Sequence, residues 1–338
     1  MKLIKTTDAV GHVLCHDLTQ IIPNQYKGAR FRKGHIIEEA DIPVLLSMGK
    51  ENLYVWENDD TKLHENDAAE ILCRLCKGEN IKRSEVKEGK IELSAEIDGL
   101  FRVNKSKLFA INSVDELMIA TRKSDTAVFK GDRLAGTRVI PLVIDKEKLK
   151  TAEKIAGDTP LMNVLPYKLK TAAIITTGSE VYHGRIEDTF TPILTEKLSL
   201  YGIEVVSHQK TDDGIENIKA AIASVKGKAD IILCTGGMSV DPDDNTPGAI
   251  KASSAEIVTY GAPVLPGAMF LLGYFGDGTP ILGLPGCVMY AKATIFDLVM
   301  PRICAGVRLT KRDFVEYGEG GLCLGCKECH YPNCGFGK

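Results

Sequence analysis

Residues 171–207 read TAAIITTGSEVYHGRIEDTFTPILTEKLSLYGIEVVS, and this stretch decides the fold. It begins with an apolar, β-branched run that is typical of a buried strand. Four large apolar side chains then follow at helical spacing: Phe190, Leu194, Leu198 and Tyr201. Gly202 stands where that helix would end, and IEVVS returns to strand character. The stretch therefore predicts a strand, a helix and a second strand.

The same alternation continues towards the carboxyl end. A second helical pattern carries Ile215, Ile218, Ile222 and Val225, and the run DIILC ends at Cys234 as a third strand. Thr246 and Pro247 read as the cap and first turn of a short helix that ends near Ala252. Further elements are expected at Pro280–Leu284 (strand) and Cys287–Ala305 (helix). This order predicts a mostly parallel, three-layer α/β domain over residues 165–310.

The amino-terminal part, residues 1–164, is less regular and reads as a mixed α+β region. Strands are expected at Leu53–Trp56, Lys90–Ile97, Leu100–Asn104 and Thr137–Ile144, and helices at Glu38–Met48 and Glu65–Lys77. A polar connection is expected at Gly78–Gly89, and the lysine-rich stretch Asp145–Lys154 is expected to lead into the α/β domain. Residues 311–338 form a short cysteine-rich tail.

Three glycine-bearing loops follow predicted strands of the α/β domain: TTGSEVYHGRIEDT, CTGGMSVDPDDNTPGA and LGLPGC. Glycines let the backbone approach a ligand closely, and helix N-termini favour negative charge, so the loops predict a site for a phosphorylated ligand. Five carboxylates stand beside these glycines: Glu180, Asp188, Asp241, Asp243 and Asp244. A divalent cation between carboxylate and phosphate would reconcile the two.

Composition argues against two classes of partner. Lysine and arginine total 42 against 45 aspartates and glutamates, so no basic footprint favours a nucleic acid. The most apolar later stretch, Ala262–Phe275, is short and interrupted by prolines, and the start MKLIKTTDAV lacks the apolar run of a signal peptide. We therefore expect no membrane insertion and a cytoplasmic location.

The ordered blocks TTGSE, GRIEDTFTPILTEKL, TDDG, CTGGMSV and GLPG resemble the molybdopterin-binding domain of molybdenum-cofactor biosynthesis proteins. The molybdopterin molybdenumtransferase branch has TGDEL, a glycine before DSN or DTN, a DD pair, SGGVSVG and GLPGNP. The tail of the second block, PDDNTPGA, is closer to the PRDVTPEA of the adenylyltransferase branch. More weakly, TTDAVGHVLCHDLT and FRKGHIIEEADIPVLLSMGKENLYVWE resemble amino-terminal pieces of the family.

The resemblance implies a function and a set of site residues. It implies insertion of molybdate, or tungstate, into adenylylated molybdopterin with release of AMP, in a homo-oligomer. Magnesium is implied at Glu180, Asp188 and Asp244, which would be the catalytic positions. The ligand-binding positions are implied to be Gly178, Ser179, Asp212, Asp213, Gly236, Gly237, Ser239, Asp241, Thr246, Gly283, Pro285 and Gly286.

Plainer interpretations exist for several of these acids. Asp188 has the position of a helix-capping acid, and Asp212 with Asp213 would suit a turn before a helix. Asp241 and Asp244 compete for one role in the second block, and Asp244 is preferred. A solvated acidic loop is the alternative for both.

The third block departs from the family because Cys287-Val288 replaces Asn-Pro. Cys287 is either an inert small apolar residue or a soft ligand for a molybdenum or dithiolene species. Two other functions therefore stay open: a carrier or sensor of molybdopterin that docks on molybdoenzymes, and the adenylyltransferase step.

The tail CLGCKECHYPNCGFGK contains Cys323, Cys326, Cys329 and Cys334, where the family has a terminal β-domain. The spacing resembles the ferredoxin run CxxCxxCxxxCP, whose fourth thiolate ligates a different cluster. An iron–sulfur cluster, a four-thiolate zinc site and redox-active thiols are the three interpretations. Cys73 and Cys76 lie on an apolar helix face and are expected to fill the core, and His12 and His16 carry no clear signal.

Overall fold

The computed structural model describes residues 2–22, 25–55, 59–242 and 244–338. The chain divides into two compact units. The first consists of Met1–Glu96, Val103–Arg122 and Lys130–Asn163, and the second of Ile97–Arg102, Lys123–Phe129 and Val164–Lys338. The predicted α/β domain, preceded by a mixed α+β region and followed by a cysteine-rich tail, is confirmed.

The second unit is built on one six-stranded sheet in the order β15-β14-β16-β19-β18-β17. Its first four strands run parallel, and the last two pairings are antiparallel. The strands are β14 (Thr171–Thr177), β15 (Glu204–Thr211), β16 (Ile231–Thr235), β17 (Glu256–Tyr260), β18 (Leu271–Tyr274) and β19 (Pro280–Leu284). The helices are α5 (Ser179–Tyr182), α6 (Phe190–Ser199), α7 (Ile215–Val225), α8 (Thr246–Ala252), α9 (Ile295–Cys304) and α10 (Lys311–Val315), with 3₁₀ turns at Gly286–Met289 and Glu316–Gly318.

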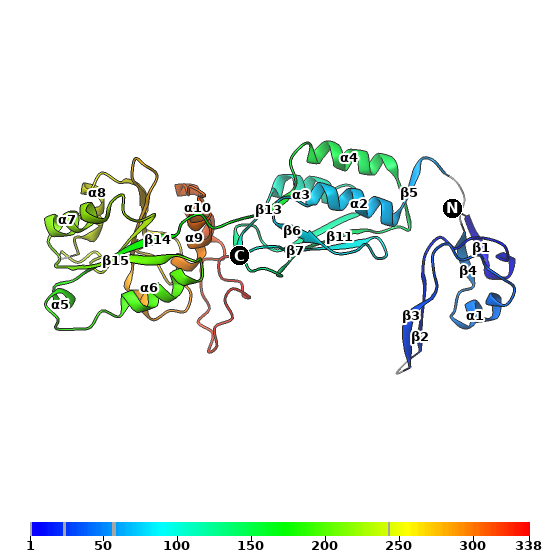
Figure 1. Ribbon diagram of the computed structural model, residues 1–338, viewed down its shortest axis with the longest axis horizontal. Coiled ribbons are helices and arrows are strands. Elements are labelled where there is room, and N and C mark those ends of the chain that lie inside the picture. The colour runs from blue at the N-terminus through cyan, green and yellow to red at the C-terminus, as the bar shows by residue number, and fades with distance from the viewer. Residues whose placement is uncertain (1, 23–24, 56–58, 243) are drawn as a thin grey trace. The chain divides into compact units, whose positions relative to one another are not determined.

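Alternation along β14 produces the three layers. Ala172 and Ile174 join the buried cluster formed with α6 and α9. Ala173 and Ile175 join the opposite cluster formed with α7 and α8. Because successive strand residues point to opposite faces, a continuous apolar run is buried on both sides. Figure 1 shows α7 and α8 on one side of β14 and β15, and α6 on the other.

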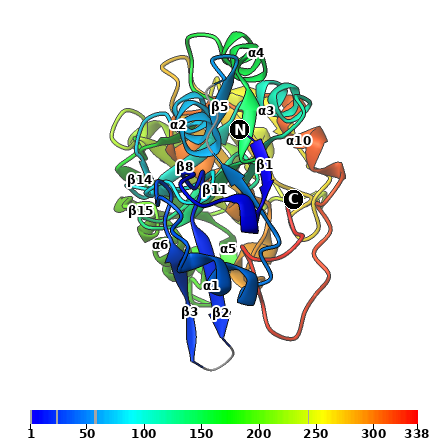
Figure 2. The same ribbon diagram turned by 90° about the vertical axis from the view of Figure 1, so that its right-hand side faces the viewer.

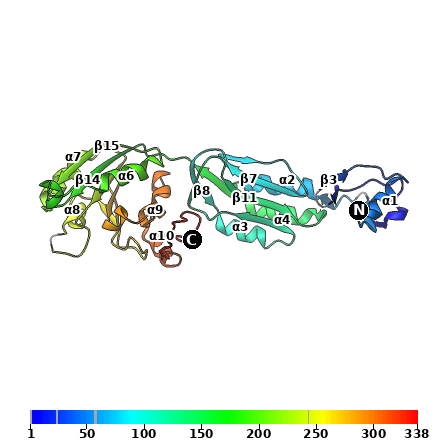
Figure 3. The same cartoon turned by 90° about the horizontal axis from the view of Figure 1, so that it is seen from below.

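The first unit contains an antiparallel sheet in the order β6-β7-β11-β9, with α2 packed against β7 and β11 (Figure 3). A hairpin of β2 and β3 (Figure 2) and a pair formed by β1 and β4 (Figure 1) lie in its amino-terminal part. The remaining helices and strands of residues 1–165 are β1 (Lys2–Lys5), β2 (Leu18–Ile22), β3 (Tyr26–Phe31), α1 (Asp41–Ser47), β4 (Asn52–Val55), β5 (Lys62–His64), α2 (Glu65–Cys76), β6 (Ile81–Arg83), β7 (Lys90–Ala95), β8 (Gly99–Val103), α3 (Lys105–Asn112), β9 (Leu117–Thr121), β10 (Thr126–Val128), β11 (Arg133–Val139), β12 (Val143–Asp145), α4 (Lys146–Ala156) and β13 (Met162–Leu165), with a 3₁₀ turn at Thr6–Asp8.

Four predicted elements of the chain are wrong in detail. The helix expected at Cys287–Ala305 is a 3₁₀ turn, a break and then α9, because Thr294 and Asp297 form a capping box that starts a new helix. The expected strand Thr137–Ile144 is split between β11 and β12. The expected connections at Gly78–Gly89 and Asp145–Lys154 contain β6 and α4. Trp56, which was expected to end a strand, and Asp243 lie outside the described residues.

No helix in the described part of the chain is long and apolar enough to cross a membrane.

Candidate functional site

The glycine loops lie at one edge of the sheet because β14, β15, β16 and β19 are parallel. Each loop starts where its strand ends: Gly178 after β14, Asp212 after β15, Gly236 after β16 and Pro285 after β19. Carboxyl ends of parallel strands meet at a common edge, which is where ligands bind open α/β sheets. The structure therefore gathers the predicted loops.

Hydrogen bonds join these loops into one layer. Thr177 Oγ1 donates to the Thr235 carbonyl at 3.1 Å and lies 3.0 Å from Thr246 Oγ1, and all three residues are buried. Asp213 Oδ2 accepts from the Ser179 backbone N–H at 2.8 Å and from its hydroxyl at 3.0 Å. Asn245 Nδ2 donates to the Asp213 carbonyl at 3.0 Å. The loops after β14, β15 and β16 are thus held in a fixed arrangement.

Two of the glycines are required by this close approach. Gly236 has φ +85°, and a Cβ there would overlap the carbonyl oxygen of Thr177. A Cβ on Gly283 would lie 2.5 Å from Cε of the buried Met238. Both glycines therefore let neighbouring loops and strands touch. Pro285 is buried, whereas Gly286 is exposed and a Cβ there would lie 4.0 Å from Cε of Met289.

The aspartate pair after β15 divides into two roles. Asp212 Oδ1 accepts from the Gly214 N–H at 2.9 Å and from Asn217 Nδ2 at 2.8 Å. These bonds hold the pKa of Asp212 below its ordinary value. Asp212 is therefore engaged within the turn that begins α7, as the plainer interpretation expects, while Asp213 links two loops.

Asp188 is fully engaged at the start of α6. Its Oδ1 accepts the backbone N–H groups of Phe190 and Thr191 at 2.9 and 3.1 Å. Its Oδ2 accepts the hydroxyls of Thr176 and Thr191 at 3.0 and 2.6 Å and lies 2.9 Å from His208 Nε2. Burial alone would raise the pKa of Asp188, but the hydrogen bonds outweigh it and hold that pKa below its ordinary value. The geometry is that of a helix-capping acid.

The other predicted acids differ in exposure. Glu180 and Asp241 are exposed at the surface of their loops, and Asp244 is half-buried. Asp244 Oδ2 accepts the Ser239 backbone N–H at 2.7 Å, and its own N–H donates to the Asp241 carbonyl at 3.0 Å. Asp244, the acid preferred from the sequence, therefore closes the acidic loop after Gly237 through hydrogen bonds within that loop.

The described residues contain no cluster of side chains that could hold a metal ion. No three of their histidine, cysteine, aspartate or glutamate side chains come together in a way that could hold an ion. Glu180, Asp188 and Asp244 thus do not form a ready-made magnesium site, and the four tail cysteines are not gathered around a common point.

Cysteines elsewhere in the chain behave as apolar side chains. Cys73 and Cys76 are buried, as predicted, and burial raises the pKa of the Cys76 thiol to about 12. Cys287 is half-buried at the 3₁₀ turn after the third loop, and burial raises its pKa. A raised pKa keeps these groups as thiols rather than nucleophilic thiolates.

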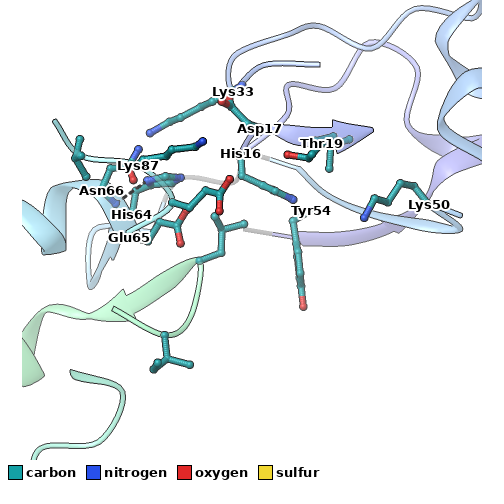
Figure 4. Close-up of a pocket in the computed structure, with 15 residues that line it drawn as sticks. His16, Asp17, Thr19, Lys33, Lys50, Tyr54, His64, Glu65, Asn66 and Lys87 are labelled. Carbon is teal, nitrogen blue, oxygen red and sulfur yellow. Dashed lines mark hydrogen bonds between the residues drawn. The ribbon is translucent and has the colours of Figure 1, made fainter. Parts of the chain in front are cut away.

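A second polar site, which the sequence did not predict, lies in the first unit. It is a cavity of about 490 Å³. Figure 4 shows residues of both charges around it, among them His16, Lys33, Lys50, His64 and Glu65. His64 is held in one orientation, since its Nε2 lies 2.7 Å from the Cys15 carbonyl and its Nδ1 accepts the Asn66 N–H. His16 Nδ1 is buried and has no hydrogen-bond partner among the described residues.

Comparison with known proteins places the glycine loops within one family. Residues 173–305 match the family described as "Probable molybdopterin binding domain", and residues 3–57 match a domain of unknown function, DUF8806. Residues 173–305 form a domain of the molybdopterin-binding family. The resemblance expected from the sequence is thereby confirmed for this part of the chain.

Individual relatives match this chain over a quarter to less than half of its length. A CinA-like protein of Pseudothermotoga lettingae is 39% identical over 85 residues, which is 25% of this chain and 21% of that protein. The chain spans about a fifth of the length of the curated relatives that it matches. A CinA structure from Thermoplasma acidophilum is 19% identical, with a TM-score of 0.35 over 40% of this chain and 98% of that one. The molybdopterin biosynthesis enzyme MoaB from Thermus thermophilus is 21% identical, with a TM-score of 0.34 over 43% and 98%.

Proposed function

We propose that the protein binds molybdopterin, or its adenylylated form, on the three glycine loops and acts in molybdenum-cofactor biosynthesis. The observation that carries the proposal is the hydrogen-bonded layer of Thr177, Thr235 and Thr246 beneath the loops. It fixes Gly178 and Gly236 at the carboxyl edge of the parallel strands, which is where ligands bind open α/β sheets. The family match over residues 173–305 supports molybdopterin as the ligand.

The reaction proposed first resembles that of molybdopterin molybdenumtransferase. The chain would hold adenylylated molybdopterin in place while molybdate, or tungstate, enters the dithiolene and AMP leaves. Positioning by preordered loops is the protein's main contribution, since orientation alone lowers barriers by several kcal/mol, up to about 10. Asp188 supports this positioning indirectly by fixing the start of α6.

Magnesium does not fit the expected set of three acids, because the carboxylate of Asp188 already accepts four hydrogen bonds and lies 2.9 Å from His208 Nε2. Glu180 and Asp241 remain exposed beside the loops. The proposed binding therefore does not rest on a cation held by these three acids.

A carrier or sensor of molybdopterin is the second candidate. Cys287 stands where the transferase pattern has asparagine, so an amide donor is replaced by a half-buried thiol. A site that has lost this donor keeps the phosphate-binding loops and still binds, while the chemical step is impaired. The adenylyltransferase step is supported only by the likeness of PDDNTPGA.

One pair of assays separates the three functions. Purified protein is incubated with magnesium, molybdate and adenylylated molybdopterin, and separately with molybdopterin and ATP, while binding of each pterin is followed by calorimetry. AMP release with molybdenum insertion in the first reaction is the expected result. Binding without turnover would identify a carrier, adenylylated product in the second reaction would identify the adenylyltransferase, and absence of binding would refute all three.

A further inference from the structure

The last residues of the chain lie outside the molybdopterin-binding match, and no glycine loop involves them. Cys323, Cys326, Cys329 and Cys334 fall there at spacings of three, three and five residues. All four are free thiols. After the short turn at Glu316–Gly318 the tail has no helix or strand, and Figure 2 shows it as a long red loop beyond α10.

The base of this loop is firmly attached to the second unit. Leu265 donates its N–H to the Gly321 carbonyl at 2.9 Å, and Cys323 donates to the Leu265 carbonyl at 2.8 Å. Gly337 donates to the Gly320 carbonyl at 2.8 Å, which closes the loop on itself. Phe336 is buried in the core cluster beside α9. Both ends of the loop are therefore fixed.

The four thiols are arranged as two pairs by this attachment. Cys323 and Cys334, near the two ends, are half-buried against the same apolar cluster. Cys326 and Cys329, in the middle, are exposed. Tyr331, which lies between Cys329 and Cys334 in the sequence, donates its hydroxyl to the Asp297 carbonyl at 3.0 Å and attaches that side of the loop to α9. Two thiols are thus anchored while two lie on an irregular segment.

A segment that is attached at both ends but has no helix or strand requires some other interaction to hold it in one conformation. Irregular loops of this length are uncommon in compact domains and are usually functional. Here the loop buries little surface, since Lys327, Glu328 and His330 are exposed and so are Leu322 and Leu324. Ligation by thiolates would supply the missing order, because binding of a metal and folding of its ligand segment are coupled. The four thiols are not gathered in the described residues, so binding requires the middle of the loop to fold around the cluster.

We propose that the tail binds an iron–sulfur cluster through the thiolates of Cys323, Cys326, Cys329 and Cys334. Three thiols in one run at i, i+3 and i+6 match the way a chain wraps such a cluster. Four-thiolate zinc sites are commonly built from two cysteine pairs that lie about 15 to 20 residues apart, whereas here only two residues separate the pair Cys323 and Cys326 from Cys329 and Cys334. The ligands lose their protons on binding, and no redox step is required of the protein. The proposal does not rest on the function of the glycine loops.

The test uses the full chain, produced with iron and cysteine supplied and purified without oxygen. About four iron atoms and four sulfides per chain, with a brown colour from broad visible absorption, are expected for a [4Fe–4S] cluster. The double variant Cys326→Ser/Cys329→Ser should lose iron, sulfide and colour to background levels. Both side chains are exposed, so this variant keeps the core intact. The matched control Glu328→Gln changes an exposed residue between them and should retain the cluster.

Four outcomes would overturn the proposal. They are one zinc ion per chain in place of iron, four free thiols with no metal after anaerobic purification, a disulfide within the tail, and unchanged iron content in the double variant. Far-ultraviolet circular dichroism of each variant confirms that the rest of the chain is folded, so a loss of iron reports on the tail.

Discussion

Asp188 Oδ2, two residues before α6, lies 2.9 Å from Nε2 of His208 on β15. The carboxylate side chain is only 6% exposed. It accepts hydrogen bonds from two backbone N–H groups and two threonine hydroxyls, besides its contact with the imidazole. The ionised form of Asp188 is therefore built into the fold of the glycine-loop domain, whatever ligand the loops hold.

The first prediction concerns acid stability. The pKa of Asp188 is lower in the native state than the ordinary value of 3.8, so its contribution is present above that pH and is lost as pH falls through the native pKa. Asp188→Asn should lower the free energy of unfolding at pH 7 by about 1 to 3 kcal/mol, since hydrogen bonds to a charged group are weakened. Denaturant unfolding from pH 7 to pH 2.5 measures the difference between variant and wild type.

The difference between the two proteins should shrink as pH falls below about 3.8, where the carboxylate of the unfolded chain takes up a proton, and should be lost once pH falls through the lower native pKa. Glu187→Gln is the matched control, because it removes the charge of an exposed neighbour and should change stability by less than about 0.5 kcal/mol at any pH. A pH-independent gap between Asp188→Asn and wild type would contradict the role given to the charge.

The second prediction concerns the backbone of the second glycine loop. Gly236→Ala introduces a Cβ at φ +85° that overlaps the Thr177 carbonyl, and should destabilise the domain by at least about 1 to 3 kcal/mol. Gly248→Ala is the control, since Gly248 lies inside α8 with open space around it. This change should stabilise the protein by about 0.5 to 1 kcal/mol. Equal thermal midpoints for the two variants would refute the close approach.

Sequence patterns locate β14 and β19 accurately because their apolar runs are continuous. TAAIITT becomes β14 over Thr171–Thr177, and PILGL becomes β19 over Pro280–Leu284, residue for residue. Strands buried on both faces carry no competing periodicity, so their limits coincide with the limits of the apolar run. The loops then follow at their carboxyl ends, and the position of the three glycine loops at one edge of the sheet could be predicted with them.

Elements whose signals are weak or composite could not be predicted in the same way. β17 and β18 flank a segment broken by Pro263, Pro266 and Gly267, which hides the antiparallel pairing at the edge of the sheet. The start of α9 was missed although Thr294-x-x-Asp297 is a capping box that the sequence displays. The roles of Asp188, Asp212 and Asp213 depend on which donors reach them in space, and spacing along the chain does not contain that information.

The third prediction uses the contact between Gly283 and Met238. Gly283→Ala should cost about 1 to 3 kcal/mol, because the new Cβ would lie 2.5 Å from the methionine Cε in a packed core. Met238→Ala should itself destabilise by opening a cavity. In the double variant the alanine methyl partly fills that cavity, so the combined loss should be smaller than the sum of the single losses. Additive losses in urea unfolding would show that the two residues do not touch.

The fourth prediction tests whether the buried threonines hold the loops for binding. Thr177→Val keeps the shape of the side chain but removes the hydroxyl that bonds to the Thr235 carbonyl and to Thr246 Oγ1. Both partners are buried, so the loss in free energy of unfolding should be about 1 to 3 kcal/mol.

The affinity for molybdopterin should fall as well in Thr177→Val, because the loops after β14 and β16 lose their shared anchor. Thr195→Val is the control: its hydroxyl bonds to the Thr191 carbonyl on the exposed side of α6, and its removal should change stability by about 0.5 kcal/mol or less. The double variant Thr177→Val/Thr246→Val should recover part of the loss, since two apolar groups then face each other. A Thr177→Val protein that is destabilised yet binds molybdopterin as tightly as wild type at low temperature would separate the threonine layer from the binding site.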